Sequence, residues 1–303
     1  MKLILLSDIH YMVDNPVGRK DDVHQTISGK VGFTLKYALD NDATILQAGD
    51  FGDSSRSWRI LFSLSKLLEK YPAKIYGVHG QHDRYMYSDN TDNTTLGVLN
   101  ALNFLNILTE YPTRLSPGIH VYGCSFGQPV PEPSNGKARN ILVIHRGIYG
   151  SKLWEKQGGD FAPHFLTKHD KFHLILCGDI HQKFIFISED GRTICNTGPL
   201  LRGKASLDMF EHKPGFWEYD TDTDKLKWVE VPHRLADEVL SRDHIESKEE
   251  TEAMLEEFVA SIKACDLEGI SFQEVLADFL VKNEISDDVR SILAEVTNEG
   301  GVP

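Results

Sequence analysis

Cysteine is scarce in this chain, and its four cysteines show no C-x-x-C spacing. A small secreted fold held together by disulfides would carry cysteines more densely, so we expect no disulfide framework and a reducing compartment. Most of the cysteines lie in apolar, strand-like segments, where a cysteine behaves as a small buried thiol. These are Cys124, Cys177 and Cys195, with Cys265 as the exception.

The chain also lacks a long apolar run. No stretch approaches the roughly 20 residues that a membrane-spanning helix needs, and the first apolar run starts at the N-terminus, which leaves no room for a signal peptide. We therefore expect a soluble, cytoplasmic protein without a membrane partner. With 303 residues and 41% hydrophobic content, the chain can bury a sizeable core in one large or two modest domains.

The net charge of -13 would argue against a nucleic-acid partner if it were spread evenly. It is concentrated instead near the C-terminus, where residues 234–303 hold 6 Lys and Arg against 18 Asp and Glu. The remaining residues hold 26 basic against 27 acidic side chains. The body of the protein is thus close to neutral, and DNA stays open as a substrate.

Five short apolar runs each end in residues that can bind a metal. Such runs predict buried strands. Because ligands in open α/β sheets bind beyond the carboxyl ends of the strands, we expect the five ends to form one site. They are LILLS before Asp8 and His10, ATILQ before Asp50, KIYGV before Gly80, Gln81, His82 and Asp83, ILVI before His145, and FHLILC before Asp179 and His181.

Helical patterns alternate with the first of these strands, at about 28–39, 58–71 and 96–102, which predicts a layered α/β domain. The later runs FIFI, RTIC, GFWEY and KLKWVEV predict antiparallel meanders that finish a second sheet. From about residue 235 the chain becomes charged and helical. We expect a catalytic domain over 1–232 and an acidic helical domain over 233–303.

The residues at the strand ends suit phosphoester hydrolysis. This reaction needs a nucleophile, neutralisation of charge on the phosphate and a proton for the leaving oxygen. Two divalent metals about 3.5–4 Å apart can supply the first two. Asp, His and amide ligands suit Mn, Fe or Zn better than Ca or Mg, and Asp50, at a tight glycine turn, is the natural candidate to bridge two ions.

In their order and approximate spacing these motifs resemble those of the calcineurin-like metallophosphoesterases, over about residues 1–205. The segments GDFGDSSRSW and NTGPLLRGKASLDMF look similar to those of the SbcD-type DNA repair nucleases, including phage versions. The resemblance implies a four-layer αββα sandwich with two bound divalent metals, manganese foremost. It also implies the roles of the site residues: one metal on Asp8, His10, Asp50 and His181, a second on Asp50, Gln81, His145 and Asp179, His82 as general acid, and Asp83 fixing the tautomer of His82.

The chain departs from the family pattern at two of these positions. Gln81 stands where the family usually has Asn, and Asp179 where it usually has His. Both can ligate through oxygen, so the second metal position is expected, with its identity and affinity open. Tyr11, Arg84, Tyr85 and Arg146 flank the motifs and are candidates for substrate contact.

Two questions stay open at this point. The substrate is DNA, cleaved by an exo- or endonuclease, or else a small-molecule or cyclic-nucleotide phosphodiester or a phosphatase substrate. The helices expected after residue 235 have apolar faces that must be buried against something. By resemblance the partner is an SbcC-like, SMC-type ATPase, and the alternative is a second copy of this chain.

Overall fold

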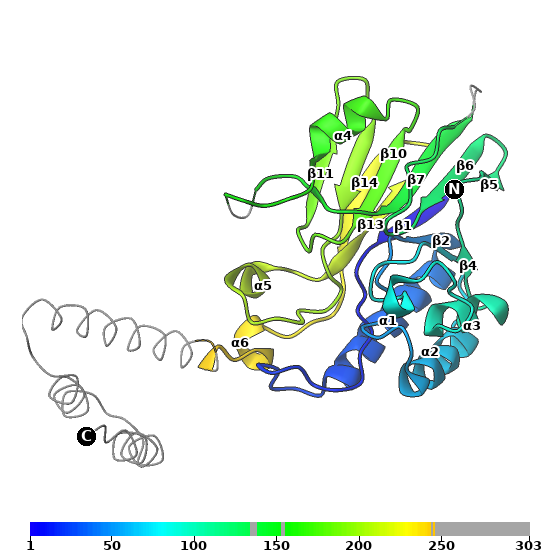
Figure 1. Cartoon of the computed structure of the whole chain (residues 1–303). Coiled ribbons are helices and arrows are strands. Elements are labelled where there is room, and N and C mark those ends of the chain that lie inside the picture. Colours follow the sequence, from blue (N-terminus) through cyan, green and yellow to red (C-terminus); the bar gives the residue numbers. More distant parts are fainter. Residues whose placement is uncertain (134–137, 153–154, 244, 246–303) are drawn as a thin grey trace, which may run out of the picture. The chain divides into compact units, whose positions relative to one another are not determined.

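The computed structural model describes residues 1–133, 138–152, 155–243 and 245 (Figure 1). Residues Met1–Ser241 form one compact unit. The helical domain predicted over 233–303 lies almost entirely outside the described residues. That domain and its boundary near Pro232 therefore stay predictions.

Two six-stranded mixed sheets form the centre of this unit. Their strand orders are β14-β13-β1-β2-β3-β4 and β11-β12-β10-β7-β6-β5, and in each sheet four neighbouring strands are parallel. The first sheet contains β1 (Lys2–Leu6), β2 (Ala43–Gln47), β3 (Ile75–Gly77), β4 (Asn106–Ile107), β13 (Gly215–Asp220) and β14 (Lys225–Glu230). The second contains β5 (Thr113–Ser116), β6 (Ile119–Cys124), β7 (Arg139–His145), β10 (Leu174–Gly178), β11 (Phe184–Ile187) and β12 (Thr193–Asn196), and β8 (Ile148–Tyr149) pairs separately with β9 (Asp160–Phe161).

Helices cover the outer faces of both sheets (Figure 1). Three lie on the first sheet: α1 (Val23–Asp40), α2 (Trp58–Lys70) and α3 (Thr95–Ala101). The second sheet packs against α4 (Ala162–Lys168). Three shorter elements complete the unit: η1 (Tyr85–Tyr87), α5 (Leu207–Glu211) and α6 (Ala236–Val239).

The alternation of side chains along the strands produces the layers. On β1, Ile4 and Leu6 pack with the helices, whereas Leu3 and Leu5 face the second sheet. The strands of the second sheet alternate in the same way between the inter-sheet core and α4. Because each sheet buries both faces, its central strands, β1 and β2 in the first sheet and β7 and β10 in the second, are buried along nearly their whole length. The predicted four-layer αββα arrangement is confirmed.

The sequence predicted that all four later strands finish the second sheet, and this is wrong for two of them. β11 and β12 do extend the second sheet, but β13 and β14 belong to the first, where β13 pairs antiparallel with β1. The short distance in sequence between these strands predicted the two hairpins. It could not specify which sheet each hairpin joins, because this depends on pairing with strands that are distant in the sequence.

α1 starts at Val23, several residues before the predicted start, because the side chain of Asp22 accepts a hydrogen bond from Gln25 N (2.9 Å) and caps the helix. Cys124, Cys177 and Cys195 are buried free thiols, as predicted. Among the described residues, no helix is both long and apolar enough to span a bilayer.

Candidate metal centre

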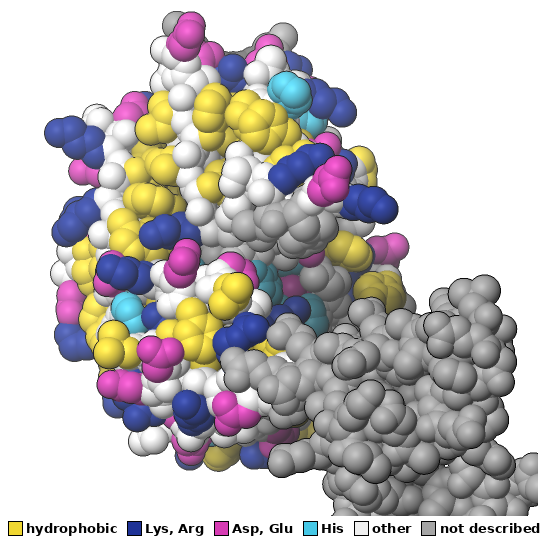
Figure 2. All heavy atoms as spheres, turned by 90° about the vertical axis from the view of Figure 1, so that its left-hand side faces the viewer, with side chains coloured by type: hydrophobic (Ala, Val, Ile, Leu, Met, Phe, Trp, Pro, Cys, Tyr) yellow, Lys and Arg dark blue, Asp and Glu magenta, His cyan; other side chains and the backbone are white. Residues whose placement is uncertain are grey.

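The five predicted strand ends meet in one recess. The residues at or just after the carboxyl ends of β1, β2 and β3 in the first sheet, and of β7 and β10 in the second, contribute to it. Figure 2 shows histidine and acidic side chains gathered there, with Lys and Arg side chains on the surrounding surface. Three overlapping groups have ligand atoms within 4.8 Å of one another: Asp8 with His10 and His181, Asp8 with Asp50 and His145, and His10 with Asp50 and His82.

The first predicted ligand set is closely grouped. Nε2 of His10 lies 3.0 Å from Nε2 of His181 and 3.7 Å from Oδ2 of Asp50. Nε2 of His181 lies 4.0 Å from Oδ1 of Asp8. These separations leave the four side chains facing a common point.

The second set surrounds His145. Its Nε2 lies 2.7 Å from Oε1 of Gln81, 3.5 Å from Oδ2 of Asp50 and 4.0 Å from Oδ1 of Asp179. Nε2 of Gln81 donates a hydrogen bond to Oδ1 of Asp179 (3.0 Å), which turns the amide oxygen toward His145. Asp50 therefore contacts both sets.

The hydrogen bonding indicates that cations fit here. Nδ1 of His145 donates to the carbonyl of Ala48 (2.6 Å), so Nε2 presents a lone pair to the amide oxygen of Gln81. Two acceptors facing each other at that distance repel unless a cation lies beside them. Within the described part of the chain, Oδ2 of Asp8 and Oδ2 of Asp50 are buried without a hydrogen-bond partner, although such atoms are normally satisfied.

The pKa values of the site residues also indicate that cations fit here. Burial raises the pKa of Asp8 to about 7, and burial together with repulsion from Asp83 raises that of Asp50 to about 8. Burial lowers the pKa of His145 and of His181 to about 3, so both imidazoles are neutral at physiological pH. Neutral imidazoles among under-compensated carboxylates are what divalent cations require.

The backbone of the site is constrained. Gly80 packs so closely on Asp50 that a Cβ there would clash with its carboxylate, and a Cβ on Gly49 would clash with the ring of His145. Asp8, His10 and Asp50 have left-handed φ angles of 47°, 45° and 52°. Residues other than glycine rarely adopt such φ angles, and this kind of backbone strain is concentrated at functional sites.

His82 and Asp83 are adjacent in the chain, but the first is exposed and the second is buried. The backbone N–H of His82 donates to Oδ1 of Asp50 (2.9 Å), and its exposed ring lies 5.0 Å from the ring of His10. This places an imidazole at the mouth of the recess, as expected for a proton donor.

The role predicted for Asp83, fixing the tautomer of His82, is not what the structure shows. Its buried carboxylate accepts hydrogen bonds from the backbone N–H groups of Phe51, Gly52 and Gly80, at 2.9–3.2 Å. Asp83 therefore ties the turn after β2 to the turn after β3. Its carboxylate thus faces the backbone of these two turns.

Sequence reasoning missed residues that brace the ligands. Oδ1 of Asp53 lies 3.6 Å from Nδ1 of His10. Asn196 donates to the carbonyl of Ile180 (2.8 Å) and accepts from Ser7 Oγ (2.9 Å), so it joins the loop bearing Asp179 and His181 to the end of β1. Both residues lie in segments that carry the family resemblance, Asp53 in GDFGD and Asn196 in NTG.

Of the four flanking candidates, two are structural. The hydroxyl of buried Tyr11 contacts Ser28 Oγ (2.6 Å), and buried Arg84 donates to the carbonyl of Phe126 (2.7 Å). Tyr85 is 40% exposed and lies beneath the guanidinium of Arg56. Arg146 lines a pocket.

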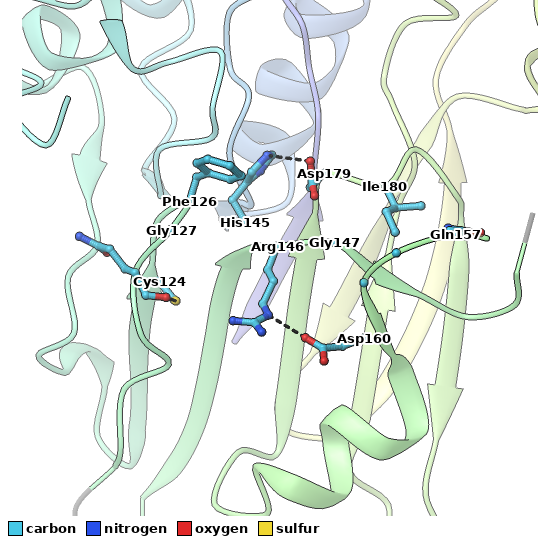
Figure 3. Close-up of a pocket in the computed structure, with 13 residues that line it drawn as sticks. Cys124, Phe126, Gly127, His145, Arg146, Gly147, Gln157, Asp160, Asp179 and Ile180 are labelled. Atoms are coloured by element: carbon cyan, nitrogen blue, oxygen red, sulfur yellow. Dashed lines mark hydrogen bonds and ion pairs between the residues drawn. The ribbon is translucent and has the colours of Figure 1, made fainter. Parts of the chain in front are cut away.

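That pocket, of about 650 Å³, opens beside the second ligand set. Figure 3 shows His145 and Asp179 at one end, with Phe126 beside them and Arg146 pointing toward Asp160. The ion pair between these last two measures 2.7 Å. The space is larger than a phosphate group alone would need.

A family model for the calcineurin-like phosphoesterases matches residues 1–183, which is more than half of the chain. The chain therefore belongs to the calcineurin-like phosphoesterase family. Proteins of this superfamily use two divalent metals and are typically hydrolases, in agreement with the groups of ligands described above.

Solved structures similar to this one include a protein from Thermus thermophilus, at 14% identity and a TM-score of 0.47, covering 76% of this chain and 99% of that one. A dimetal phosphatase from Danio rerio is 11% identical, with a TM-score of 0.48 and coverage of 72% and 91%. A 5'-nucleotidase from Candida albicans is 14% identical, with a TM-score of 0.42 and coverage of 74% and 53%. No curated protein sequence matches the chain.

Proposed function

We propose that this protein is a dinuclear metal-dependent phosphodiesterase that cleaves DNA, as an exo- or endonuclease of the SbcD type. The observation that carries the proposal is the large pocket that opens on the ligands of the metal centre. A site built for a free phosphate would need only the recess itself.

In this proposal Asp8, His10, Asp50 and His181 hold one ion, and Asp50, Gln81, His145 and Asp179 hold the other. Their nitrogen and oxygen donors suit manganese, with iron or zinc as alternatives. When bound, the two ions would lower the pKa of a water and neutralise charge on the phosphate. The carboxylate and amide oxygens around the second position favour a harder ion there.

The chain itself supplies the proton. The ring of His82 is exposed at the mouth of the recess, and its backbone is fixed to Asp50 (2.9 Å). It is placed to donate a proton to the leaving oxygen of a bound diester. Asp83 holds the turn that carries it.

Aromatic rings beside the pocket support a nucleic-acid substrate. The ring of Phe126 lies 6.3 Å from that of His145 and 6.3 Å from that of Tyr87. Tyr87 is 70% exposed, so a row of rings runs from the surface toward the metal ligands. Nucleobases stack on such rings with little preference for sequence.

A substrate panel tests this proposal. The manganese-loaded protein is incubated with labelled linear DNA, closed circular DNA, cyclic nucleotides and a nitrophenyl phosphate diester. We expect cleavage of DNA and of the nitrophenyl diester, and the comparison of linear with circular DNA separates exonuclease from endonuclease action. Turnover of cyclic nucleotides with DNA left intact would instead identify a small-molecule phosphodiesterase.

A variant at the surface end of the aromatic row sharpens the test. Tyr87→Ala should raise the KM for a single-stranded oligonucleotide about tenfold, since one stacked base contributes roughly 1–3 kcal/mol. Hydrolysis of the nitrophenyl diester should not change. Tyr111→Ala, which removes a similarly exposed tyrosine (71%), is the matched control.

We also propose that the segment after residue 241 binds an SbcC-like ATPase, or else a second copy of this chain. A truncation should be made after Ser241, because Ser241 N donates to the carbonyl of Gly18 (2.8 Å) and Leu240 packs near Met209. A cut after Pro232 would remove these contacts. The truncated protein should keep diester hydrolysis and lose co-purification with the ATPase, or dimerisation. Precipitation or loss of metal would contradict a docking role.

A further inference from the structure

A second pocket, of about 430 Å³, is formed by residues that are not shared with the pocket at the metal centre. It lies where the first turns of α1 meet the preceding loop and the segments around Arg202 and 232–239. Its charged or ionisable lining side chains are Arg19, Asp21, Lys30, Arg202, His233 and Arg234.

This pocket holds more buried positive charge than negative. The side chains of Arg19 and Asp21 are 2% and 4% exposed, and Lys30 and Arg202 are 5% and 4% exposed. Asp21 pairs with both Arg19 (2.5 Å) and Arg234 (3.7 Å), and it is the only acid among the described lining residues. Buried cations are normally matched by acids. Three buried cations, Arg19, Lys30 and Arg202, thus share one buried carboxylate, and Arg234, whose side chain is 58% exposed, adds a further positive group.

Backbone carbonyl oxygens accept many of the hydrogen bonds that these cations donate. A carbonyl group is neutral, so it does not neutralise their charge. Lys30 Nζ donates to Leu200 O (2.9 Å), Arg19 Nη1 to Arg202 O (2.9 Å), and Arg202 to His212 O and Arg234 O (both 2.8 Å). Within the described residues, Nε of Arg19 is buried and has no hydrogen-bond partner. Burial first, and then repulsion from Arg202 and Arg19, lowers the pKa of Lys30 to about 7.

We propose that this pocket binds a phosphate dianion, either free phosphate or the terminal phosphate of a small molecule. Guanidinium groups recognise phosphate through charge-assisted hydrogen bonds, and those of Arg19, Arg202 and Arg234 belong to residues that line this pocket. A dianion matches the surplus charge better than a single carboxylate. The volume leaves room for more than the phosphate itself. The proposal is independent of the substrate proposed for the metal centre.

Calorimetric titration of the full-length chain with inorganic phosphate, in chloride buffer, tests this site. A chelator removes the metal ions that would otherwise bind phosphate at the metal centre, so one phosphate per chain is expected. Lys30→Met and Arg234→Gln should each weaken this binding about tenfold, the usual effect of losing one charge-assisted contact. Lys36→Gln, on the exposed face of α1, is the matched control and should leave it unchanged.

The side chain of Arg234 is 58% exposed, so Arg234→Gln should fold. This variant therefore tests phosphate binding if Lys30→Met does not fold. Tighter binding of a nucleoside monophosphate than of phosphate would identify a phosphorylated small molecule as the ligand, and equal binding would identify free phosphate. Absence of binding to the chelated protein, or equal binding by the parent, Lys30→Met and Arg234→Gln, would overturn the proposal.

Discussion

Asp53 lies behind His10, on the opposite side of the ring from Asp50. Oδ1 of Asp53 is 3.6 Å from Nδ1 of His10, while Nε2 is 3.7 Å from Oδ2 of Asp50. Burial opposes protonation of His10, but Asp53 and Asp50 together raise its pKa. A carboxylate placed behind a histidine in this way fixes the tautomer that leaves the other nitrogen free to bind a metal.

Asp53→Asn should therefore weaken manganese binding about 10–100-fold, the usual effect of removing such a partner. Asp14→Asn, at an exposed carboxylate, is the control and should have no effect on affinity. Calorimetric titration with Mn²⁺ measures both. Equal affinities for the two variants would show that Asp53 does not orient His10.

His82→Ala should separate chemistry from metal binding. Its ring is exposed and belongs to neither of the two predicted ligand sets, so the variant should retain its metal. The rate on substrates with poor leaving groups should fall about 10²–10⁴-fold, with a smaller loss on nitrophenyl esters, which do not need a proton donor. An equal loss on both classes of substrate would indicate that His82 only positions the phosphate.

Gly80→Ala should disrupt the centre, because a Cβ at this position would collide with the carboxylate of Asp50. We expect metal binding to fall sharply in a protein that still folds. The matched substitution is Gly29→Ala in α1, where a Cβ meets nothing within 4 Å and helix propensity predicts a gain of roughly 0.5–1 kcal/mol in stability. Metal content and thermal unfolding of both variants provide the measurement, and normal metal content in Gly80→Ala would contradict the close packing.

The carboxylates also predict a dependence of stability on pH. Burial and Asp83 raise the pKa of Asp50 from 3.8 to about 8, so between these values the folded metal-free protein binds the proton more tightly than the unfolded chain. Ionisation of Asp50 therefore lowers the free energy of unfolding as the pH rises from about 4 to about 8, by at most about 1.4 kcal/mol per pH unit. Divalent ions should remove this loss, because they stabilise the ionised form.

Asp50→Asn isolates this contribution, because an amide does not titrate. With chelator present, urea unfolding at about pH 5 and about pH 8 should show the variant gaining stability relative to the parent as the pH rises. With manganese present, the parent should be the more stable protein at the higher pH. A parent that gains on the variant in chelator would show that the buried Asp50 is stabilised by other means.

Much of the site could be predicted because its residues follow strands directly. Asp8 and Asp50 follow the adjacent parallel strands β1 and β2, and His145 and Asp179 lie at the ends of the adjacent parallel strands β7 and β10. Adjacent parallel strands bring such ends together at one edge of their sheet. Alternation along β1 likewise indicates two buried faces, and hence a sheet covered on both sides.

The parts that could not be predicted depend on distant partners or on turn geometry. Asn196 reaches Ser7 across 189 positions of sequence, and no local pattern records that contact. Asp83 follows His82 directly, yet its carboxylate turns back to the backbone of Phe51 and Gly52. Strand β13 joins the first sheet because it pairs with β1, which lies near the other end of the described chain.

The most direct test of this account is the metal content of the full-length chain after equilibration with manganese, measured for the parent and for Asp50→Asn. Since Asp50 lies within reach of both ligand sets, we predict two ions per parent chain and less than one in the variant. Fewer than one ion in the parent, or two in both proteins, would contradict a dinuclear centre built on Asp50.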